Sequence, residues 1–100
     1  MSIHEIKVSA IKPANAFFRP TVSFLAEKQE VVLSALDGAM SNAVETANRL
    51  VRQKIATIER ISIDSVEVES RGRDQKSEKP RLHIYLRAVP GFVDDQADEH

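Results

Sequence analysis

Residues 31–50 read VVLSALDGAMSNAVETANRL and contain the two clearest elements of the chain. The nearly continuous apolar run at residues 31–36 is typical of a central strand that is buried on both faces. From residue 38 to residue 56, apolar side chains recur at the i, i+3, i+4, i+7 spacing of an amphipathic helix. They are Met40, Ala43, Val44, Ala47, Leu50, Val51 and Ile55. Asp37 precedes this helix and is its predicted N-cap.

Upstream of this stretch, the sequence predicts a strand at residues 5–10 and a helix at residues 14–28. Apolar and polar side chains alternate in the strand, which is the period of a half-buried strand, and Pro13 follows it. Pro20 lies inside the helix and removes one backbone hydrogen bond. We therefore expect an irregular first turn, with Asn15 as its cap.

Downstream, residues 58–70 predict a strand in which the apolar positions change from odd to even numbers. A strand that keeps one face buried needs an inserted residue for this change, so we expect a bulge at residues 64–65. Residues 71–80 form a predicted polar turn, and residues 82–88 alternate as a final strand that pairs back on the previous one. The βαβαββ order predicts an α/β fold, a two-layer sandwich with a mixed four-stranded sheet.

The composition limits the class of protein. The chain has 100 residues and no cysteine, which fits one domain and excludes disulfides, thiolate metal sites and cysteine nucleophiles. No apolar run approaches the roughly 20 residues of a membrane-spanning helix, and the first residues lack the pattern of a secretory signal. We expect an intracellular protein, cytoplasmic and/or nuclear, with no membrane partner.

The residues that usually carry chemistry are scattered. His4, His83 and His100 are far apart and lack the spacing of a metal site. The serines form no nucleophile elbow and the glycines form no phosphate loop. An acid–base pair that only folding assembles stays open at this point. The sequence predicts no catalytic residue, no metal and no cofactor, and a protein that is not an enzyme.

The charge is distributed unevenly along the chain. The net charge is -1, but residues 94–100 hold four of the fifteen acidic residues and none of the fourteen basic ones, so the rest carries +3. Residues 70–81 hold five basic residues against two acidic ones. The basic ones are Arg71, Arg73, Lys76, Lys79 and Arg81.

A cation-rich turn on a two-stranded base is suited to lie along a phosphate backbone, which gives affinity without sequence preference. We predict that residues 71–81 bind nucleic acid in this way, and that Gly72 lets the arginines beside it approach closely. The alternative is a solvated surface loop. Lys12, in the loop after the first strand, is a second candidate for phosphate contact, although most single surface lysines have no such role.

The second helix and the strand after it add four cations to a possible basic surface: Arg49, Arg52, Lys54 and Arg60. A solvated helix face is the favoured interpretation, because Glu45 and Arg49 are four residues apart in the order that suits an ion pair. Three side chains share the outward side of the last strand: His83, Tyr85 and Arg87. Base stacking is an alternative there, but a packing role, either in a subunit interface or under the chain's own loops, is favoured.

The order of several motifs resembles the Alba family of chromatin and RNA-binding proteins, from residue 6 to residue 89. The motifs are Ile11-Lys12-Pro13, residues 31–36 leading into residues 38–44, Ile61-Ser62-Ile63, Arg71-Gly72-Arg73 and residues 82–86. The Arg-Gly-Arg hairpin and the Ser-Ala-Leu strand end look more like eukaryotic members than archaeal ones.

The resemblance implies a βαβαββ domain, here residues 1–93, that dimerises and binds DNA or RNA. The family contacts are a loop lysine, the start of the second helix and the long hairpins. By position, they correspond to Lys12, Arg71, Gly72 and Arg73. Residues 94–100 are too acidic to bury an apolar surface and are predicted to be a disordered tail that competes for the basic arms.

Two departures from the family pattern shift weight to the hairpins. Ile11 stands where many archaeal members have the first of two adjacent lysines. Leu36, Asp37 and Gly38 stand where those members have an arginine-rich turn, and Asp37 would repel phosphate. This pattern suits RNA at least as well as duplex DNA.

The leading interpretation is a protein that binds RNA and/or DNA, as a homodimer or as a heterodimer with another Alba-like protein. The alternative is a protein subunit of a ribonucleoprotein, such as the Alba-like subunits of ribonuclease P, that acts mainly through heterodimer contacts. A small enzyme on a similar fold is a third possibility, and the lack of a convergent polar cluster disfavours it.

Overall fold

The computed structural model describes residues 3–69 and 76–94. Its elements are β1 (His4–Val8), α1 (Asn15–Lys28), β2 (Glu30–Leu36), a 3₁₀ turn (Asp37–Ala39), α2 (Met40–Arg52), β3 (Ala56–Glu69) and β4 (Lys76–Ala88). The βαβαββ order that the sequence predicts is therefore confirmed.

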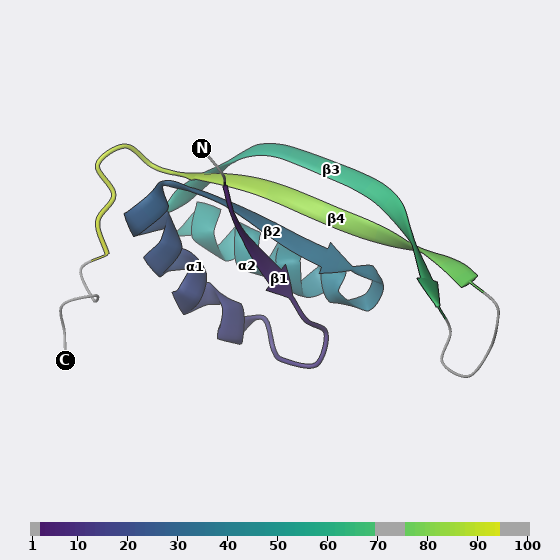
Figure 1. The fold of residues 1–100 in the computed structure, drawn as a ribbon. Helices are drawn as coiled ribbons and strands as arrows, with labels where there is room; N and C mark the ends of the chain where they lie inside the picture. Colours follow the sequence, from purple (N-terminus) through teal and green to yellow (C-terminus); the bar gives the residue numbers. More distant parts are fainter. Residues whose placement is uncertain (1–2, 70–75, 95–100) are drawn as a thin grey trace.

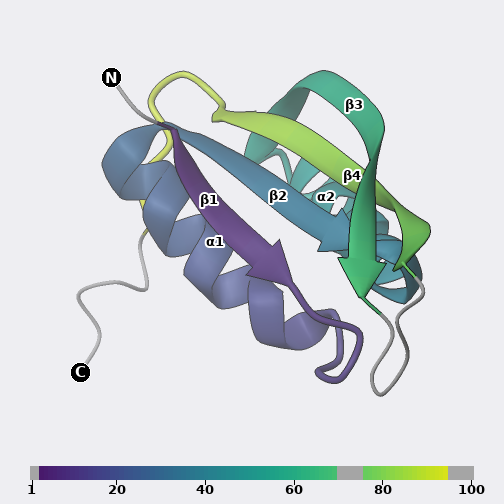
Figure 2. The ribbon, with the colours of Figure 1, turned by 45° about the vertical axis from the view of Figure 1, so that its right-hand side comes forward.

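The four strands form one mixed sheet in the order β1-β2-β4-β3. β1 runs parallel to β2, whereas β4 is antiparallel to both β2 and β3. Both helices cover the same face of the sheet, with α1 on the β1 side and α2 on the β4 side (Figures 1 and 2). The fold is the predicted two-layer α/β sandwich, and the other face of its sheet is open.

The position of β2 in the middle of the sheet explains its apolar run. Every residue from 31 to 35 is buried. Val32 and Ser34 point to the open face, yet they are only 7% and 8% exposed, because long side chains flank them. Their partners in β4 are Tyr85 and His83. The core proper lies between sheet and helices, and its most buried large side chains include Leu25, Leu33, Leu50, Ile84 and Leu86.

The first turn of α1 includes two bonds of the 3₁₀ type, from the N–H of Ala16 to the carbonyl oxygen of Pro13 at 2.9 Å and from the N–H of Phe17 to that of Ala14 at 3.0 Å, in agreement with the irregular first turn that the sequence predicts. The helix itself has no break at Pro20. It begins at Asn15 and continues through Pro20, which lies on the exposed side. Pro20 therefore removes only one backbone bond at the solvent surface. Ala14 occupies the N-cap position without a side-chain hydrogen bond, so the predicted Asn15 cap is wrong. The buried Thr21 hydroxyl donates to the carbonyl oxygen of Phe17 at 2.6 Å.

The predicted N-cap of α2 is also wrong. Ala39 occupies that position and makes no side-chain cap bond. Asp37 instead opens the 3₁₀ turn with a φ of 49°, a left-handed conformation that aspartate tolerates better than most residues. Its carboxylate is free of any capping role and points toward another element, as described below.

The helix α2 ends at Arg52, four residues earlier than predicted. Lys54 adopts a φ of 59°, and its N–H donates to the carbonyl oxygen of Val51 at 3.0 Å. The N–H of Ile55 donates to the carbonyl oxygen of Leu50 at 2.9 Å. This pair of bonds is a Schellman motif, which terminates a helix by reversing the chain. Ile55 therefore lies outside the helix, and its partly buried side chain packs against the core.

β3 and β4 form a long hairpin whose outer part extends beyond the helices (Figure 1). β4 begins at Lys76, so residues 76–80 are paired strand where the sequence predicted a turn. The irregularity in the ladder lies between Ile58 and Arg60, and the predicted bulge at residues 64–65 is wrong.

The parity change in β3 has a different cause. Ile63 pairs with the buried Leu82 and lies on the helix side, whereas Val66 pairs with Lys79 and lies on the opposite side. The ladder between them is continuous. The change needs no bulge, because the outer hairpin lies beyond the helices and neither of its faces covers the core.

Candidate nucleic-acid interface

Three segments meet at the end of the molecule where β1 and β2 terminate. They are the loop at residues 9–14, the 3₁₀ turn after β2 and the β3–β4 hairpin (Figure 2). Side-chain bonds link the first segment to α2 and the second to the hairpin. Lys12, Lys79 and Arg81 therefore lie toward the same end of the molecule.

The loop that carries Lys12 has a defined conformation. β1 ends at Val8, two residues earlier than predicted, and the N–H of Ile11 donates to Ser9 Oγ at 2.9 Å. Asn42, in the first turn of α2, donates through Nδ2 to the carbonyl oxygens of Ser9 and Lys12, each at 2.9 Å. Lys12 is exposed. No sequence signal identifies Asn42, because it acts on residues about 30 positions away.

Lys79 lies in a paired strand and not in the predicted turn. Its Nζ is 3.5 Å from Asp37 Oδ2. The left-handed φ of Asp37 at the start of the 3₁₀ turn brings this carboxylate toward the hairpin. Both side chains are about half exposed, at 43% and 54%. Asp37 therefore tethers the hairpin to the body, and it also occupies a cation that phosphate would need.

Arg81 makes the best-defined ion pair in the hairpin. Its Nε and Nη2 donate to the two carboxylate oxygens of Asp64 at 3.1 and 2.7 Å. The two residues are direct partners in the β3–β4 ladder. The hydrogen bond from Arg81 lowers the pKa of the Asp64 carboxyl below its ordinary value, and the same bond raises the pKa of Arg81. Both side chains are solvent-exposed at the base of the outer hairpin.

For four of the predicted contacts the structure describes no side chain. Arg71, Gly72 and Arg73 lie outside the described residues. Lys76 opens β4 and pairs with Glu69 through its backbone. Their part in a binding surface stays a prediction from the sequence.

Arg49 packs between the helices. Its Nη1 donates to Asn15 Oδ1 at 2.7 Å, and its guanidinium lies 3.8 Å from the ring centroid of Phe18. The structure shows no Arg49–Glu45 pair among the residues it describes, so the predicted pairing is wrong. Arg49 links α2 to α1 instead.

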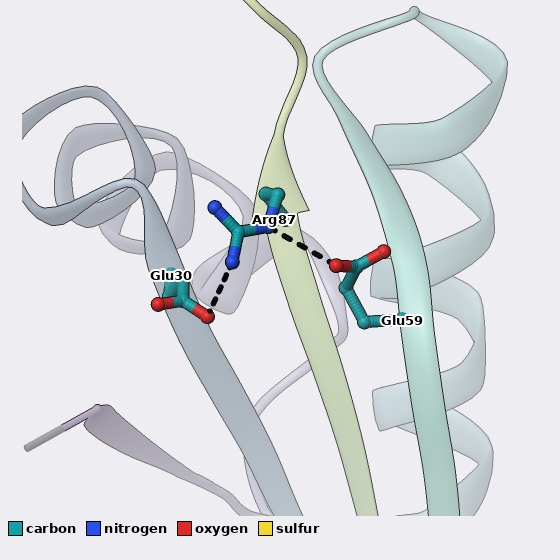
Figure 3. A network of polar contacts seen from close by, with 3 residues as sticks. All are labelled: Glu30, Glu59 and Arg87. Atoms are coloured by element: carbon teal, nitrogen blue, oxygen red, sulfur yellow. Dashed lines mark hydrogen bonds and ion pairs between the residues drawn. The ribbon is translucent and has the colours of Figure 1, made fainter.

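Arg60 and Arg87 are engaged on the open face of the sheet. Arg60 lies 4.2 Å from the ring centroid of Tyr85. Arg87 is in β4, the strand between β2 and β3. Its guanidinium donates to Glu30 of β2 and to Glu59 of β3, each at 3.0 Å (Figure 3). These contacts hold the sheet together across β2, β4 and β3, and they leave this end of the open face without an excess of positive charge.

An apolar surface that the sequence did not predict runs along α2 and β3. It consists of Val44, Val51, Ile58, Ile61 and Ile63, which are 38% to 66% exposed. The isoleucines pair with buried residues of β4 and so lie on the helix side of the sheet. α2 packs against β3 as well as β4 but leaves these side chains at the surface, so the expected burial of the five residues within one chain is wrong. We call these five residues the α2–β3 surface.

A single mixed sheet, two helices on one face and a projecting β3–β4 hairpin define a small α/β binding domain of the Alba type. The family model of Alba matches residues 4–65, more than half of the chain. The chain belongs to the Alba family, a family of generally nucleic-acid-binding, dimeric proteins that are binding domains and not enzymes.

Two solved structures show the same fold. Alba from Thermoplasma volcanium gives a TM-score of 0.72 at 20% sequence identity, over 84% of this chain and 99% of that chain. ALBA1 from Trypanosoma brucei gives a TM-score of 0.73 at 22% sequence identity, over 92% of this chain and 75% of that chain. Comparison with curated proteins gives no match.

Two structural features are absent from residues 3–69 and 76–94. No helix in this part of the chain is long and apolar enough to cross a membrane. No three or more histidine, aspartate or glutamate side chains in it are grouped closely enough to hold a metal ion.

Proposed function

We propose that this chain is a dimeric protein that binds RNA and/or DNA through the phosphate backbone. The basic hairpin and Lys12 make the contacts. The observation that carries the proposal is the projection of the β3–β4 hairpin beyond the helices, with Lys79 and Arg81 on the described part of it (Figure 1). An arm of this shape can follow a nucleic-acid backbone while the body stays outside the groove.

The ion pairs at the hairpin base do not prevent this function. Exposed pairs such as Lys79–Asp37 and Arg81–Asp64 contribute typically 1 kcal/mol or less, roughly, because water competes for both partners. A phosphate can displace the carboxylate from Arg81 and accept the same two parallel N–H bonds. The carboxylates lower the affinity without removing the site.

The dimer forms, in this proposal, through the α2–β3 surface. The sequence suggested the outward side of β4, but Tyr85 and His83 are half-buried there among their neighbours. On α2 the exposed valines are flanked by Glu45 on one side and Arg52 on the other. Two such helices packed antiparallel about a twofold axis would place Glu45 of each chain near Arg52 of its partner, which is the self-complementarity that a symmetric dimer requires.

A second candidate function follows from the same surface. The α2–β3 surface also fits a different Alba-like chain, in which case this protein would act as a heterodimeric subunit of a ribonucleoprotein. Binding would then depend on the partner, and the isolated chain would bind nucleic acid weakly or remain monomeric.

The experiment that tests the proposal is a titration of the purified chain with RNA and with duplex DNA over a series of salt concentrations. Phosphate contact predicts that the logarithm of affinity falls linearly with the logarithm of salt concentration. Lys12→Ala should weaken binding and flatten this line. Binding that is absent, or that does not respond to salt, would contradict the proposal and favour the ribonucleoprotein subunit.

A further inference from the structure

Ile11 is unusual among the apolar side chains of this protein. It is 94% exposed, whereas Val93, the next most exposed large apolar side chain in the described residues, is 67% exposed. It is also separate from the α2–β3 surface. Single exposed apolar residues are common in proteins, so exposure alone assigns no role to Ile11.

The support beneath Ile11 gives the exposure its meaning. Both amide hydrogens of Asn42 are used on the loop, one on the carbonyl oxygen of Ser9 and one on that of Lys12, so the loop is held on either side of Ile11. The N–H of Ile11 is itself bonded to Ser9 Oγ. Pro13 restricts the backbone of Lys12 as well. Ile11 is therefore held out into water by a fixed turn.

The neighbour of Ile11 in this turn is a cation. Lys12 is exposed, and no carboxylate in the described part of the chain is paired with it. The turn thus presents an exposed apolar residue and an exposed cation at adjacent positions of the chain. A nucleotide offers the matching pair, since its base has an apolar face and its phosphate is an anion.

We propose that residues 9–12 are a preformed contact for an unpaired nucleotide, in which Lys12 binds the phosphate, Ile11 packs on the base and Asn42 is the positioning residue. This inference rests on the proposed function and names its substrate class, single-stranded RNA or single-stranded DNA. In a duplex the faces of the bases are stacked on one another, so only Lys12 would gain a contact there.

The test uses three probes of equal length: an oligouridine, an oligothymidine and an RNA duplex. Ile11→Ser should weaken binding of the two single strands about tenfold, or about 1.4 kcal/mol, and leave duplex binding unchanged. The salt dependence should not change, because no charge is removed. Val93→Ser is the matched control, since it removes another highly exposed apolar side chain and should change nothing.

The positioning role of Asn42 needs a separate comparison. Asn42→Ala should weaken single-strand binding and reduce the salt dependence as Lys12→Ala does, because the lysine is no longer held. In the Lys12→Ala, Ile11→Ser background it should have no further effect, since residues that act as a unit are not additive. Gln53→Ala, which removes an amide at the other end of α2, is the control. Thermal unfolding of each variant checks the fold.

The outcomes separate this inference from the proposed function. Equal losses on single strands and duplex, or no loss with Ile11→Ser, would overturn the base contact. Full additivity of Asn42→Ala in the double-variant background would overturn the positioning role. If Lys12→Ala and Arg81→Ala also leave all binding unchanged, the proposed function fails as a whole. If Ile11→Ser weakens binding of the oligouridine and the oligothymidine equally, the site binds unpaired bases of RNA and DNA alike. If it weakens binding of only one of them, the ligand is that nucleic acid.

Discussion

At the scale of single residues, the described cations of the hairpin are held by carboxylates. Asp64 bonds to Arg81, and Asp37 pairs with Lys79. These pairs fix where the cations lie before any ligand arrives. They also make the surface less attractive to phosphate than the count of lysines and arginines in the sequence suggests. In the proposed function, these pairs lower the affinity of the hairpin base for phosphate.

The Asp64–Arg81 pair predicts a pH dependence of stability. The pKa of Asp64 lies below its ordinary value of 3.8 in the folded protein, so the pair stabilises the fold fully above that value. The stabilisation is lost as the pH falls through the lowered pKa, because protonation then removes the charge. Asp64→Asn should be slightly less stable than the parent at neutral pH and equal to it at a pH well below 3.8. Urea unfolding at the two pH values measures the difference.

A constant difference between parent and Asp64→Asn at both pH values would show that the pair acts through packing alone. Asp37→Asn is a useful companion, since the Asp37–Lys79 pair is longer, at 3.5 Å, than the 2.7 Å contact of Arg81 with Asp64. We therefore expect a weaker pH dependence of the difference for Asp37→Asn than for Asp64→Asn.

At the scale of elements, periodicity in the sequence predicts most of the fold. The apolar run of β2 is confirmed, and so is the part of the predicted α2 stripe that holds Ala43, Ala47 and Leu50, because their burial depends on local spacing. The errors arise where one element depends on another. The residue at which β4 begins depends on its pairing with β3. The exposure of Ile61 and Ile63 depends on which part of the sheet α2 covers.

The same limit applies to the candidate site. Lys12 and the basic hairpin stand out from composition and spacing. Asn42 and Asp37 do not, because a single amide or carboxylate shows its role only through the distant residues that it contacts. The distribution of charge along the sequence predicts that residues 71–81 form a binding surface. Only the folded chain shows that Lys79 and Arg81 are paired with carboxylates.

The hairpin is the element on which the proposed function depends. Arg71→Ala combined with Arg73→Ala should leave the thermal midpoint almost unmoved, because exposed cations contribute typically within about half a kcal/mol to folding. The same variant should weaken binding at least tenfold, roughly 1.4 kcal/mol. Each lost phosphate contact should reduce the salt slope by about 0.9 on duplex and about 0.7 on single strands.

Binding by this double variant that equals the parent, with an unchanged salt slope, would show that the hairpin is only a loop. Protein contacts through the α2–β3 surface would then become the leading explanation. Filter binding or fluorescence anisotropy over the salt series distinguishes the two results.

The segment after β4 is an element that the sequence placed partly in a disordered tail. Gly91, with a φ of 80°, and Pro90 turn the chain, and the N–H of Phe92 donates to the carbonyl oxygen of Val89 at 3.0 Å. Phe92 packs against the core. Two residues further on, Arg19 Nη2 donates to both carboxylate oxygens of Asp94 at 3.0 and 2.8 Å, and this carboxylate is only 4% exposed.

Two truncations test this contact. Removal of residues 95–100 should leave the thermal midpoint unchanged. Removal of residues 94–100 should lower it by several degrees, since a hydrogen bond to a charged group contributes about 1.5–3 kcal/mol and 1 kcal/mol shifts a domain of this size by about 4–8 °C. Differential scanning calorimetry measures both. Equal midpoints for the two truncations would mean that Asp94 contributes nothing to the fold.

At the scale of the whole molecule, the hairpin and the segment after β4 lie far apart. The extent along the long axis is 50 Å. The outer hairpin lies at one end, and the segment after β4, which leads to Asp94, lies at the other (Figure 1). The six residues after Asp94 span about 20 Å at most. While Asp94 is bound to Arg19, the acidic residues therefore do not reach the outer hairpin of their own chain, and their competition for it must be weak.

The α2–β3 surface predicts how whole molecules assemble. Ile63 is 66% exposed, so Ile63→Glu should leave the fold of one chain intact. A charge in an apolar interface is costly to desolvate, so the same variant should dissociate the dimer to a monomer near 11.2 kDa. Val93→Glu is the matched control, because Val93 is 67% exposed and lies outside the α2–β3 surface. Sedimentation velocity at micromolar concentration compares the two variants with the parent. If the parent and the Ile63→Glu variant are both dimeric, the dimer interface lies outside the α2–β3 surface. A parent that is monomeric by itself, and that dimerises only with another Alba-like chain, would establish the heterodimer.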